Sequence, residues 1–446
     1  MDIKGKKMLV VGLGKTGVKT VKFLIRKEAC VRASDILPLE KLPDEVRELK
    51  RDGVYIETGK HSRESFLWAD TIILSPGVPF GLPLVEEAIK NGVEVISEVE
   101  FAFRYVKKPI IGITGSNGKT TTSTLVARIL EASGKRVFLG ANIGTPLIQI
   151  AERDEDFDVL VLELSSFQLQ GTVTFKPFIG VILNISPNHL DHHASFEEYM
   201  ESKFKLFANQ TEDDWSVYNF DDFYIRSYMP EIKSRKLPFG FTSTDKGVFF
   251  DGIFVRFGEE MYDLRDMKLV GAHNLENAMA AIASTRIMGC DPEIIEREIV
   301  GFSPLPHRIE FVGEFNGVRF FNDSKATSPG ATLRALQSFS GSVILIAGGK
   351  DKGVDYSMLR DEVARKVKVL ILIGESKFQM QKELGDSVKT HIASSLEEAI
   401  EIAISNSSRG DTVLFSPACS SFDMFSSYEE RGRRFKEGVW RYQKQG

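Results

Sequence analysis

Short apolar runs alternate along the chain with longer segments in which apolar residues recur at helical spacing. The strand-length runs cover residues 8–11, 30–34, 71–74, 137–139, 159–163, 179–184, 343–347, 369–373 and 412–415. The last three runs are almost continuously apolar, which is typical of strands buried on both faces of a sheet. Helical spacing follows several runs, for example at residues 18–26 and 274–288. Buried strands that alternate with helices predict parallel α/β sheets.

Turn-forming residues divide the chain, whose 446 residues exceed the size of one ordinary core. Prolines and glycines cluster at residues 76–83, a hairpin turn is predicted at 251–252, and the prolines at 304–306 indicate a linker. We therefore expect three α/β domains, each with a mainly parallel sheet. They are a Rossmann-like N-terminal domain at residues 1–97, a P-loop central domain at 98–303 and a Rossmann-like C-terminal domain at 304–446.

Composition and charge narrow the class of protein. With 42% apolar residues, 27% charged residues and a net charge of −5, the chain gives no reason to expect nucleic acid or a membrane as a partner. Cys30, Cys290 and Cys419 are few and far apart, which is typical of a reduced, cytoplasmic protein. No apolar run approaches the roughly 18 residues of a spanning helix. The run at residues 8–11 ends in glycines and is not interpreted as a signal peptide.

The strongest chemical motif runs from Gly112 to Thr122 and reads GITGSNGKTTT. It follows the end of an apolar strand and opens a helix, so backbone N–H groups and the helix dipole would converge on phosphate. Lys119 would reach the terminal phosphates, and the Thr120 hydroxyl would bind magnesium. The motif is shorter than the strict P-loop, because Ile113 stands where a glycine is usual. It predicts binding of a nucleoside triphosphate.

Two further strands end in residues that could hold a metal. Glu163 closes an apolar strand, and in nucleotide hydrolases a carboxylate at that place holds magnesium on the phosphates. His189 follows the next strand, on the rim of the sheet where Lys119 is expected. We interpret both as metal ligands, and His192 and His193 as loop residues.

Lys203 and Lys205 lie in a helix predicted over residues 196–207. Their spacing alone favours a basic face in contact with solvent. The sequence therefore gives neither lysine a chemical role by itself.

The first segment carries a second glycine loop, GLGKTG at residues 12–17, between a strand and a helix. Asp35 at the end of the next strand completes a pattern typical of dinucleotide binding. The pattern leaves NAD and another nucleotide equally open. Ser75 follows a strand in this segment, and either a phosphate or sugar contact or a plain turn would explain it.

Four clusters of Asp, Lys and Ser follow or end strands in the third segment, at residues 306–310, 320–327, 348–355 and 416–423. A packed core has no need of such clusters, whereas serines and backbone amides after a strand can bind a carboxylate. No Ser-His-Asp order supports a hydrolase triad, and Cys419 lacks a nearby base, so we interpret it as a small buried residue. The chain thus predicts one anion site in each domain.

Together these motifs resemble the Mur ligase family across essentially the whole chain, and within it the branch that adds D-glutamate. The similar stretches are GSNGKT at 115–120, LSSFQL at 164–169, NDSKAT at 322–327 and SPACSSFD at 416–423, together with the first glycine loop. Ser116 replaces the usual threonine, and Ser328 stands where the motif usually continues with asparagine.

The resemblance implies an ATP-dependent ligase that adds D-glutamate to UDP-N-acetylmuramoyl-L-alanine through an acyl phosphate, in peptidoglycan precursor synthesis. It implies ATP, two Mg²⁺ ions and a monomer acting on small molecules, and it argues against NAD. The alternatives are another Mur-type ligase, a folate polyglutamate ligase or, from a different class, an NAD-dependent dehydrogenase.

The resemblance also implies roles for single residues. The UDP-substrate is expected at Gly14, Lys15, Thr16, Asp35, Ser75, Asn142 and Ser165. ATP is expected at Gly115, Ser116, Asn117, Gly118, Lys119, Thr120, Thr121, Asn274, Asn277, Arg308 and Asp323. D-Glutamate is expected at Lys325, Thr327, Lys352, Ser421 and Tyr428. Catalysis is assigned to Lys119, His189, Lys203 and Lys352, and metal binding to Thr120, Glu163, His189 and a carbamylated Lys203.

Overall fold

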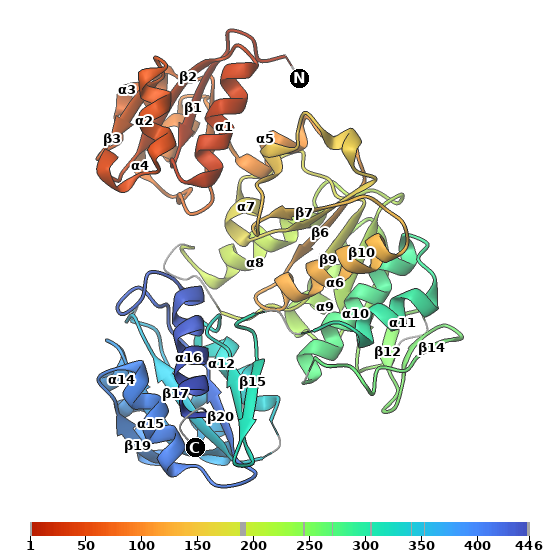
Figure 1. Cartoon of the computed structure of the whole chain (residues 1–446). Coiled ribbons are helices and arrows are strands. Elements are labelled where there is room, and N and C mark those ends of the chain that lie inside the picture. Colours follow the sequence, from red (N-terminus) through yellow and green to blue (C-terminus); the bar gives the residue numbers. More distant parts are fainter. Residues whose placement is uncertain are drawn as a thin grey trace. The chain divides into compact units, whose positions relative to one another are not determined.

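The computed structural model describes residues 2–187, 193–243, 246–269, 271–303, 306–339, 341–351 and 353–443. The described strands, shown in Figure 1, form three sheets. The chain divides into two compact units. One unit comprises Met1–Arg265 with Glu276–Ile299, and the other comprises Asp266–Leu275 with Val300–Gly446. The expected α/β class with three mainly parallel sheets is confirmed.

The first sheet has the strand order β3-β2-β1-β4-β5, and every neighbouring pair is parallel. Its elements are β1 (Lys7–Val11), α1 (Lys15–Arg26), β2 (Cys30–Asp35), α2 (Asp44–Arg51), β3 (Tyr55–Thr58), α3 (Arg63–Trp68), β4 (Thr71–Leu74), α4 (Pro83–Lys90) and β5 (Glu94–Ser97). The strand order reverses between β1 and β4. Sheets of this type bind ligands beyond the carboxyl ends of the strands at that point, which is where the first glycine loop lies.

The second sheet has the order β14-β13-β12-β11-β10-β9-β6-β8-β7. Its elements are α5 (Glu98–Phe103), β6 (Ile110–Thr114), α6 (Lys119–Ala132), β7 (Val137–Ala141), β8 (Val159–Glu163), α7 (Ser166–Gln170), β9 (Ile179–Ile182), α8 (Phe196–Phe204), β10 (Trp215–Asn219), α9 (Phe223–Tyr228), β11 (Arg235–Gly240), β12 (Val248–Phe250), β13 (Val255–Phe257), β14 (Glu260–Tyr262), α10 (Ala272–Ile287) and α11 (Pro292–Val300). Strands β7 to β12 are parallel, whereas β12, β13 and β14 pair antiparallel, which confirms the predicted hairpin at residues 251–252.

The position of β6 determines where the P-loop lies. Strand β6 runs parallel between β8 and β9, so the segments that follow these three strands meet at one edge of the sheet. The segment after β6 is the P-loop, Glu163 ends β8, and Asn184 follows β9. The fold therefore gathers a phosphate-binding turn and a carboxylate at the same rim.

The third sheet has the order β15-β16-β20-β17-β18-β19, with one antiparallel pair, β15 and β16. Its elements are β15 (Glu310–Phe315), β16 (Val318–Asn322), α12 (Pro329–Gln337), β17 (Val343–Gly348), α13 (Arg360–Lys366), β18 (Val367–Ile373), α14 (Lys377–Leu384), β19 (Lys389–Ile392), α15 (Leu396–Asn406), β20 (Thr412–Phe415) and α16 (Tyr428–Gln443). Along β17, Leu345 and Ile346 point into different hydrophobic clusters, so both faces of the sheet are covered as the apolar runs predicted.

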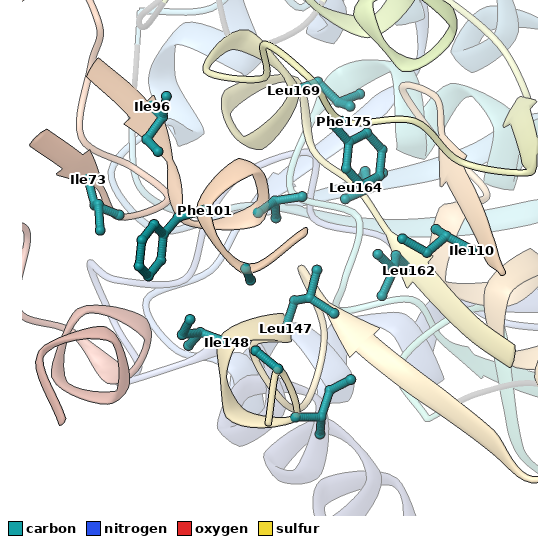
Figure 2. Close-up of a cluster of buried hydrophobic side chains, with 14 of the residues drawn as sticks. Ile73, Ile96, Phe101, Ile110, Leu147, Ile148, Leu162, Leu164, Leu169 and Phe175 are labelled. Atoms are coloured by element: carbon teal, nitrogen blue, oxygen red, sulfur yellow. The ribbon is translucent and has the colours of Figure 1, made fainter. Parts of the chain in front are cut away.

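A continuous hydrophobic core joins the first two sheets within one compact unit. Figure 2 shows Ile96 and Phe101 in the same cluster as Leu147 and Leu162. Phe101 on α5 also packs edge-on against Phe23 of α1, with ring centroids 5.9 Å apart. Helix α5 is therefore shared by the cores on both sides of it.

Among the described residues, no helix has the length and apolar character needed to cross a membrane.

Candidate active site

The turn between β6 and α6 is built for close approach of a ligand to the backbone. Gly115 and Gly118 have φ values of +152° and +85°, which L side chains rarely adopt. A Cβ at Gly118 would lie 2.3 Å from the Asn277 side-chain oxygen, so only glycine fits there. Because Gly118 is the N-cap residue and has no side chain to cap the helix, the first turn of α6 presents its N–H groups and dipole to an anion.

Asn184, just after β9, holds this turn in shape. Its backbone carbonyl accepts from the Ser116 N–H at 2.8 Å, and its side-chain oxygen accepts from the Asn117 N–H at 2.9 Å. The Ser116 hydroxyl donates to the Ser186 carbonyl at 3.0 Å, so it too shapes the turn. Sequence reasoning missed Asn184. The available signal was a polar residue at the end of the apolar run 179–184.

Asn277 and Thr121 were expected to contact ATP. Asn277 is buried on α10, and its side-chain oxygen accepts from the Thr122 hydroxyl at 3.1 Å, so it packs against the first turn of α6. Thr121 lies in that same turn and is buried. Asn274 is also buried but belongs to the other compact unit.

Two lysines converge on one carbonyl of the turn. The Lys119 ammonium donates to the Gly115 carbonyl at 2.8 Å, and Lys203 Nζ donates to the same oxygen at 2.9 Å. Lys203 is only 2% exposed, so the prediction of a solvent-facing basic side chain is wrong for it. Periodicity marks a polar side of a helix but cannot tell a side facing solvent from one facing a polar site. Lys205 is exposed, as predicted.

The surroundings of Lys203 favour its neutral form. Burial lowers the pKa of Lys203 well below its usual value, the nearby Lys119 cation lowers it further, and Glu163 opposes the shift. The Tyr199 ring lies 4.6 Å from the Lys203 ammonium. The Tyr199 hydroxyl also lies 2.8 Å from the Ser116 hydroxyl, so α8 contacts the turn twice.

Glu163 presents a buried carboxylate oxygen at the same rim. The side chain is 2% exposed, and its Oε1 accepts from Asn142 Nδ2 at 2.7 Å. Its Oε2 has no hydrogen-bond partner among the described residues. A buried oxygen left without a partner costs about 1–3 kcal/mol or more when charged, so this geometry fits a bound cation. Magnesium is a hard cation that prefers oxygen ligands.

The rest of the predicted metal set is only partly described. Thr120 lies in the first turn of α6. His189 lies outside the described residues, as does His192. Within the described ranges, no three His, Cys, Asp or Glu side chains are grouped to hold a metal ion. His193 lies outside regular helix and strand, as expected of a loop residue, but it is buried and its Nε2 contacts the Ser166 hydroxyl at 3.0 Å.

Ser75 and Asp35, which were expected to bind the UDP-substrate, form hydrogen bonds with the glycine loop of the first sheet. The Ser75 hydroxyl donates to the Gly12 carbonyl at 2.7 Å, and a Cβ at Gly17 would lie 1.8 Å from that carbonyl oxygen. Asp35 Oδ2 accepts from the Leu13 N–H at 2.6 Å. Ser75 and Asp35 therefore set the shape of the loop.

The N-terminus of α1 lies next to this loop. Gly14 is its N-cap residue, and Lys15 and Thr16 form the first turn, which contains no acidic residue. Lys15 Nζ donates to the Gly144 carbonyl at 2.7 Å, in the segment that follows Asn142. Ser165 is the N-cap of α7 and forms a capping box with Gln168, so its hydroxyl already has a structural partner.

Asp323 in the second unit is buried, and both of its carboxylate oxygens accept hydrogen bonds. Its Oδ2 accepts from the Ser416 hydroxyl at 2.7 Å, and its Oδ1 accepts from the Ile309 N–H at 3.2 Å. Burial raises the pKa of Asp323 to about 7, against the effect of these hydrogen bonds and of Arg308. Arg308 and Asp323 thus lie close enough to interact, as their shared expected role requires.

The residues expected to bind D-glutamate follow neighbouring strands of the third sheet. Strand β20 lies between β16 and β17, so the motif segments after these strands meet at one edge. The Lys325 ammonium lies 5.2 Å from the Tyr428 ring, Ser421 is buried, and Thr327 is exposed. Lys352 lies outside the described residues. Cys419 is buried as predicted, with its sulfur 3.0 Å from the Tyr356 hydroxyl.

Three family models match the chain in the order of its sheets. They are described as "Mur ligase MurD-like, N-terminal domain" at residues 6–97, "Mur ligase middle domain" at 113–285 and "Mur ligase, glutamate ligase domain" at 307–419. The fold and the rim around the P-loop thus define the class of three-domain Mur ligases.

Curated relatives identify the branch. A UDP-N-acetylmuramoylalanine–D-glutamate ligase of Geobacter sp. is 45% identical over 444 residues, which cover 98% of each chain. The ligase of the same name from Koribacter versatilis is 42% identical over 448 residues, with the same coverage. The chain belongs to the Mur ligase family, in the branch of the UDP-N-acetylmuramoylalanine–D-glutamate ligases.

Solved structures share the fold. A pseudomurein peptide ligase type C from Methanothermus fervidus matches with a TM-score of 0.62 and 21% identity, covering 97% of this chain and 100% of that one. The MurF ligase from Thermotoga maritima in complex with ADP matches with a TM-score of 0.62 and 18% identity, covering 99% and 96%.

Proposed function

We propose that this chain is an ATP-dependent ligase that joins D-glutamate to UDP-N-acetylmuramoyl-L-alanine and releases ADP and phosphate. One observation carries the substrate assignment: relatives with that activity in their name are up to 45% identical over 98% of the chain. The P-loop turn and the carboxylate beside it supply the chemistry that such a reaction needs. The compartment and the monomeric state remain predictions.

The reaction would proceed in two steps. The terminal carboxylate of UDP-N-acetylmuramoyl-L-alanine attacks the γ-phosphorus of ATP, which forms an acyl phosphate and releases ADP. The amine of D-glutamate then attacks the acyl carbon, loses a proton and expels phosphate, which leaves an amide. Lys119 and the N–H groups of the turn would hold the phosphates and offset the charge that develops on them.

Glu163, Thr120 and His189 would hold magnesium, of which two ions are expected. When bound, magnesium neutralises phosphate charge and orients the γ-phosphate for attack. Among the described residues Oε2 of Glu163 has no partner, and this supports the assignment, because a buried carboxylate oxygen needs a cation or a donor. Asn142 would keep the carboxylate in place through its contact with the other oxygen.

Lys203 would be carbamylated. A lysine amine must be neutral to attack CO2, and burial beside another cation favours that neutral form. The product is an anion, which would interact favourably with Lys119 and with magnesium where a second ammonium would be repelled. The carbamate would therefore join Glu163 as a negative group on the rim of the P-loop.

The three domains would divide the substrates between them. Residues 1–97 would bind the UDP end of the substrate at the first glycine loop, residues 98–303 would bind the phosphates of ATP, and residues 304–446 would bind D-glutamate. The dipole at the N-terminus of α1 supports the first assignment, since that helix begins in a glycine loop without acidic residues.

Phosphate release tests this function. The purified protein with ATP and magnesium should release phosphate only when both UDP-N-acetylmuramoyl-L-alanine and D-glutamate are present. ATP and a UDP-sugar should raise the melting temperature, whereas NAD should not. Sustained phosphate release without D-glutamate would contradict the proposal.

A further inference from the structure

Arg431 on α16 is a buried cation for which the reaction described above has no use. It is 1% exposed and the largest fully buried side chain among the described residues. Burial lowers the pKa of Arg431 to about 10, so the guanidinium remains charged near neutral pH. Within the described part of the chain it forms no ion pair. Carrying a charge into the interior is expensive unless the charge is fully bonded, which makes the partners of Arg431 informative.

Among the described residues, the hydrogen bonds of the Arg431 side chain all go to segments that follow a strand of the third sheet. Nε donates to the Ser324 hydroxyl at 3.0 Å, and Nη2 donates to the Ser324 carbonyl at 2.8 Å. Nη2 also donates to the Cys419 carbonyl at 3.0 Å, and Nη1 donates to the Ser420 carbonyl at 3.2 Å. The planar guanidinium therefore joins the segment after β16 to the segment after β20.

A third segment, the one after β17, packs on the same group. A Cβ at Gly349 would lie 3.1 Å from Arg431 Nη1 and 2.4 Å from the Ser420 carbonyl oxygen. That oxygen also accepts from the Lys350 N–H at 2.9 Å. Arg431 is thus in contact with three neighbouring segments at one edge of the sheet.

Helix α16 is tied to the same point. The Ser324 hydroxyl, which accepts from Arg431, donates to the Tyr428 carbonyl at 2.9 Å. Ser324 is followed by Lys325, and Ser420 by Ser421, so two of the three residues that accept hydrogen bonds from Arg431 come immediately before a residue expected at D-glutamate.

We propose that Arg431 is a positioning residue for the amino-acid substrate, and that its guanidinium sets the spacing between the segments carrying Lys325 and Ser421. This inference rests on the proposed function. D-Glutamate carries two carboxylates a fixed number of bonds apart, so groups on separate segments must be held at a matching distance. A small displacement between them would weaken amino-acid binding while leaving the P-loop, in the other compact unit, unchanged.

Two variants test the proposal. Arg431→Lys keeps the positive charge, but a single ammonium cannot reproduce four hydrogen bonds from a planar fork. Ser324→Ala leaves the arginine in place and removes the hydroxyl that accepts from Nε and donates to the Tyr428 carbonyl. Arg434→Lys, on the same helix with a side chain that is 49% exposed, is the matched control. The KM of each substrate, kcat and the melting temperature are measured for all three variants.

We expect the KM for D-glutamate to rise about tenfold in Arg431→Lys and about threefold in Ser324→Ala, since hydrogen bonds to a charged group are lost. The KM values for ATP and the UDP-substrate should stay within about twofold, a selectivity that a general loss of stability does not produce. The proposal is overturned if the KM of Arg431→Lys for D-glutamate stays within twofold of the value for the unmodified protein. It is also overturned if the KM values for D-glutamate, ATP and the UDP-substrate rise equally. If Arg431→Lys does not fold, Ser324→Ala decides the outcome. Absence of any D-glutamate-dependent turnover in the unmodified protein would instead contradict the proposed function.

Discussion

The Lys203 ammonium lies 2.9 Å from the Gly115 carbonyl oxygen, which places a buried lysine directly against the turn proposed to hold ATP. The Lys119 ammonium lies 2.8 Å from the same oxygen. Two cations this close repel each other, so one gains by losing its proton. The arrangement favours a neutral Lys203, which is the form that the proposed reaction with CO2 requires.

Replacing Lys203 by arginine should therefore remove activity. Arginine keeps the cation but cannot become neutral in a protein and cannot form the carbamate. We expect Lys203→Arg to lower kcat by about a hundredfold or more, the size of effect seen when a preorganised charged group is lost from an active site. Lys205→Arg, two residues away and exposed, is the control and should stay within about twofold. Phosphate release measures both, and a Lys203→Arg variant with more than half the normal kcat would contradict the role.

Oε2 of Glu163, which has no hydrogen-bond partner in the described part of the chain, gives a second prediction. Glu163→Gln keeps the shape of the side chain and its contact with Asn142 while removing the charge that would hold magnesium. We expect kcat/KM to fall about a hundredfold or more, because a metal ligand supports several kcal/mol of transition-state stabilisation. Glu155→Gln, an exposed glutamate of the same segment, should leave kcat/KM unchanged. A magnesium titration of the three proteins checks this, and identical curves would be incompatible with Glu163 as a ligand.

Gly118 and Gly134 flank α6 and form a matched pair for the P-loop turn. Their φ values are +85° and +84°, so alanine at either position costs about 1–2 kcal/mol of stability. A Cβ at Gly118 would also strike Asn277, whereas a Cβ at Gly134 would meet nothing within 4 Å. Gly118→Ala should therefore lose the increase in melting temperature that ATP produces, and Gly134→Ala should keep it. Equal stabilisation of both variants by ATP would show that the turn does not bind the nucleotide.

Glu98 should make stability depend on pH. Burial raises the pKa of Glu98 from 4.5 to about 7; Oε1 accepts from the Ile148 N–H at 2.8 Å, and Oε2 has no partner among the described residues. Since the folded pKa lies above the unfolded value, the stability contributed by Glu98 is present below pH 4.5 and is lost as the pH rises through about 7.

Replacing Glu98 by an uncharged residue should stabilise the protein more at higher pH. Between about pH 5 and about pH 8, the free energy of unfolding of Glu98→Gln should rise relative to the unmodified protein by about 2–3 kcal/mol. Urea denaturation at the two pH values measures the change, with the exposed Glu86→Gln as the control. A difference that does not vary with pH would mean that Glu98 is ionised in the folded protein.

The strands were the part of the fold that the sequence predicted best. Three predicted runs coincide with β4, β8 and β20. Each is apolar except for one residue at an end (Thr71, Glu163 or Thr412), because strands buried on both faces have no polar position in their interior. Strand β9 ends at Ile182, two residues before the predicted end at Asn184. Asn184 is bonded instead to the P-loop turn, a tertiary contact that strand propensity does not report.

The local sequence pattern could not predict which polar side chains are buried. Lys203 lies on a helix where a polar side chain is expected to face solvent, and only the packing of α8 against the P-loop reverses this. Arg431 lies in a strongly charged helix, with nothing in its neighbours to set it apart from the exposed Arg434. In both cases burial depends on segments distant in the sequence. A resemblance to a family indicated Lys203, whereas only the structure indicated Arg431.

Product analysis tests the central claim most directly. The protein is incubated with ATP, magnesium and UDP-N-acetylmuramoyl-L-alanine, with either D-glutamate or L-glutamate, and the products are identified by mass spectrometry. We predict one new amide, formed with D-glutamate and accompanied by one phosphate released per amide. A full yield of the amide with L-glutamate alone, or consumption of ATP without any amide, would contradict the account.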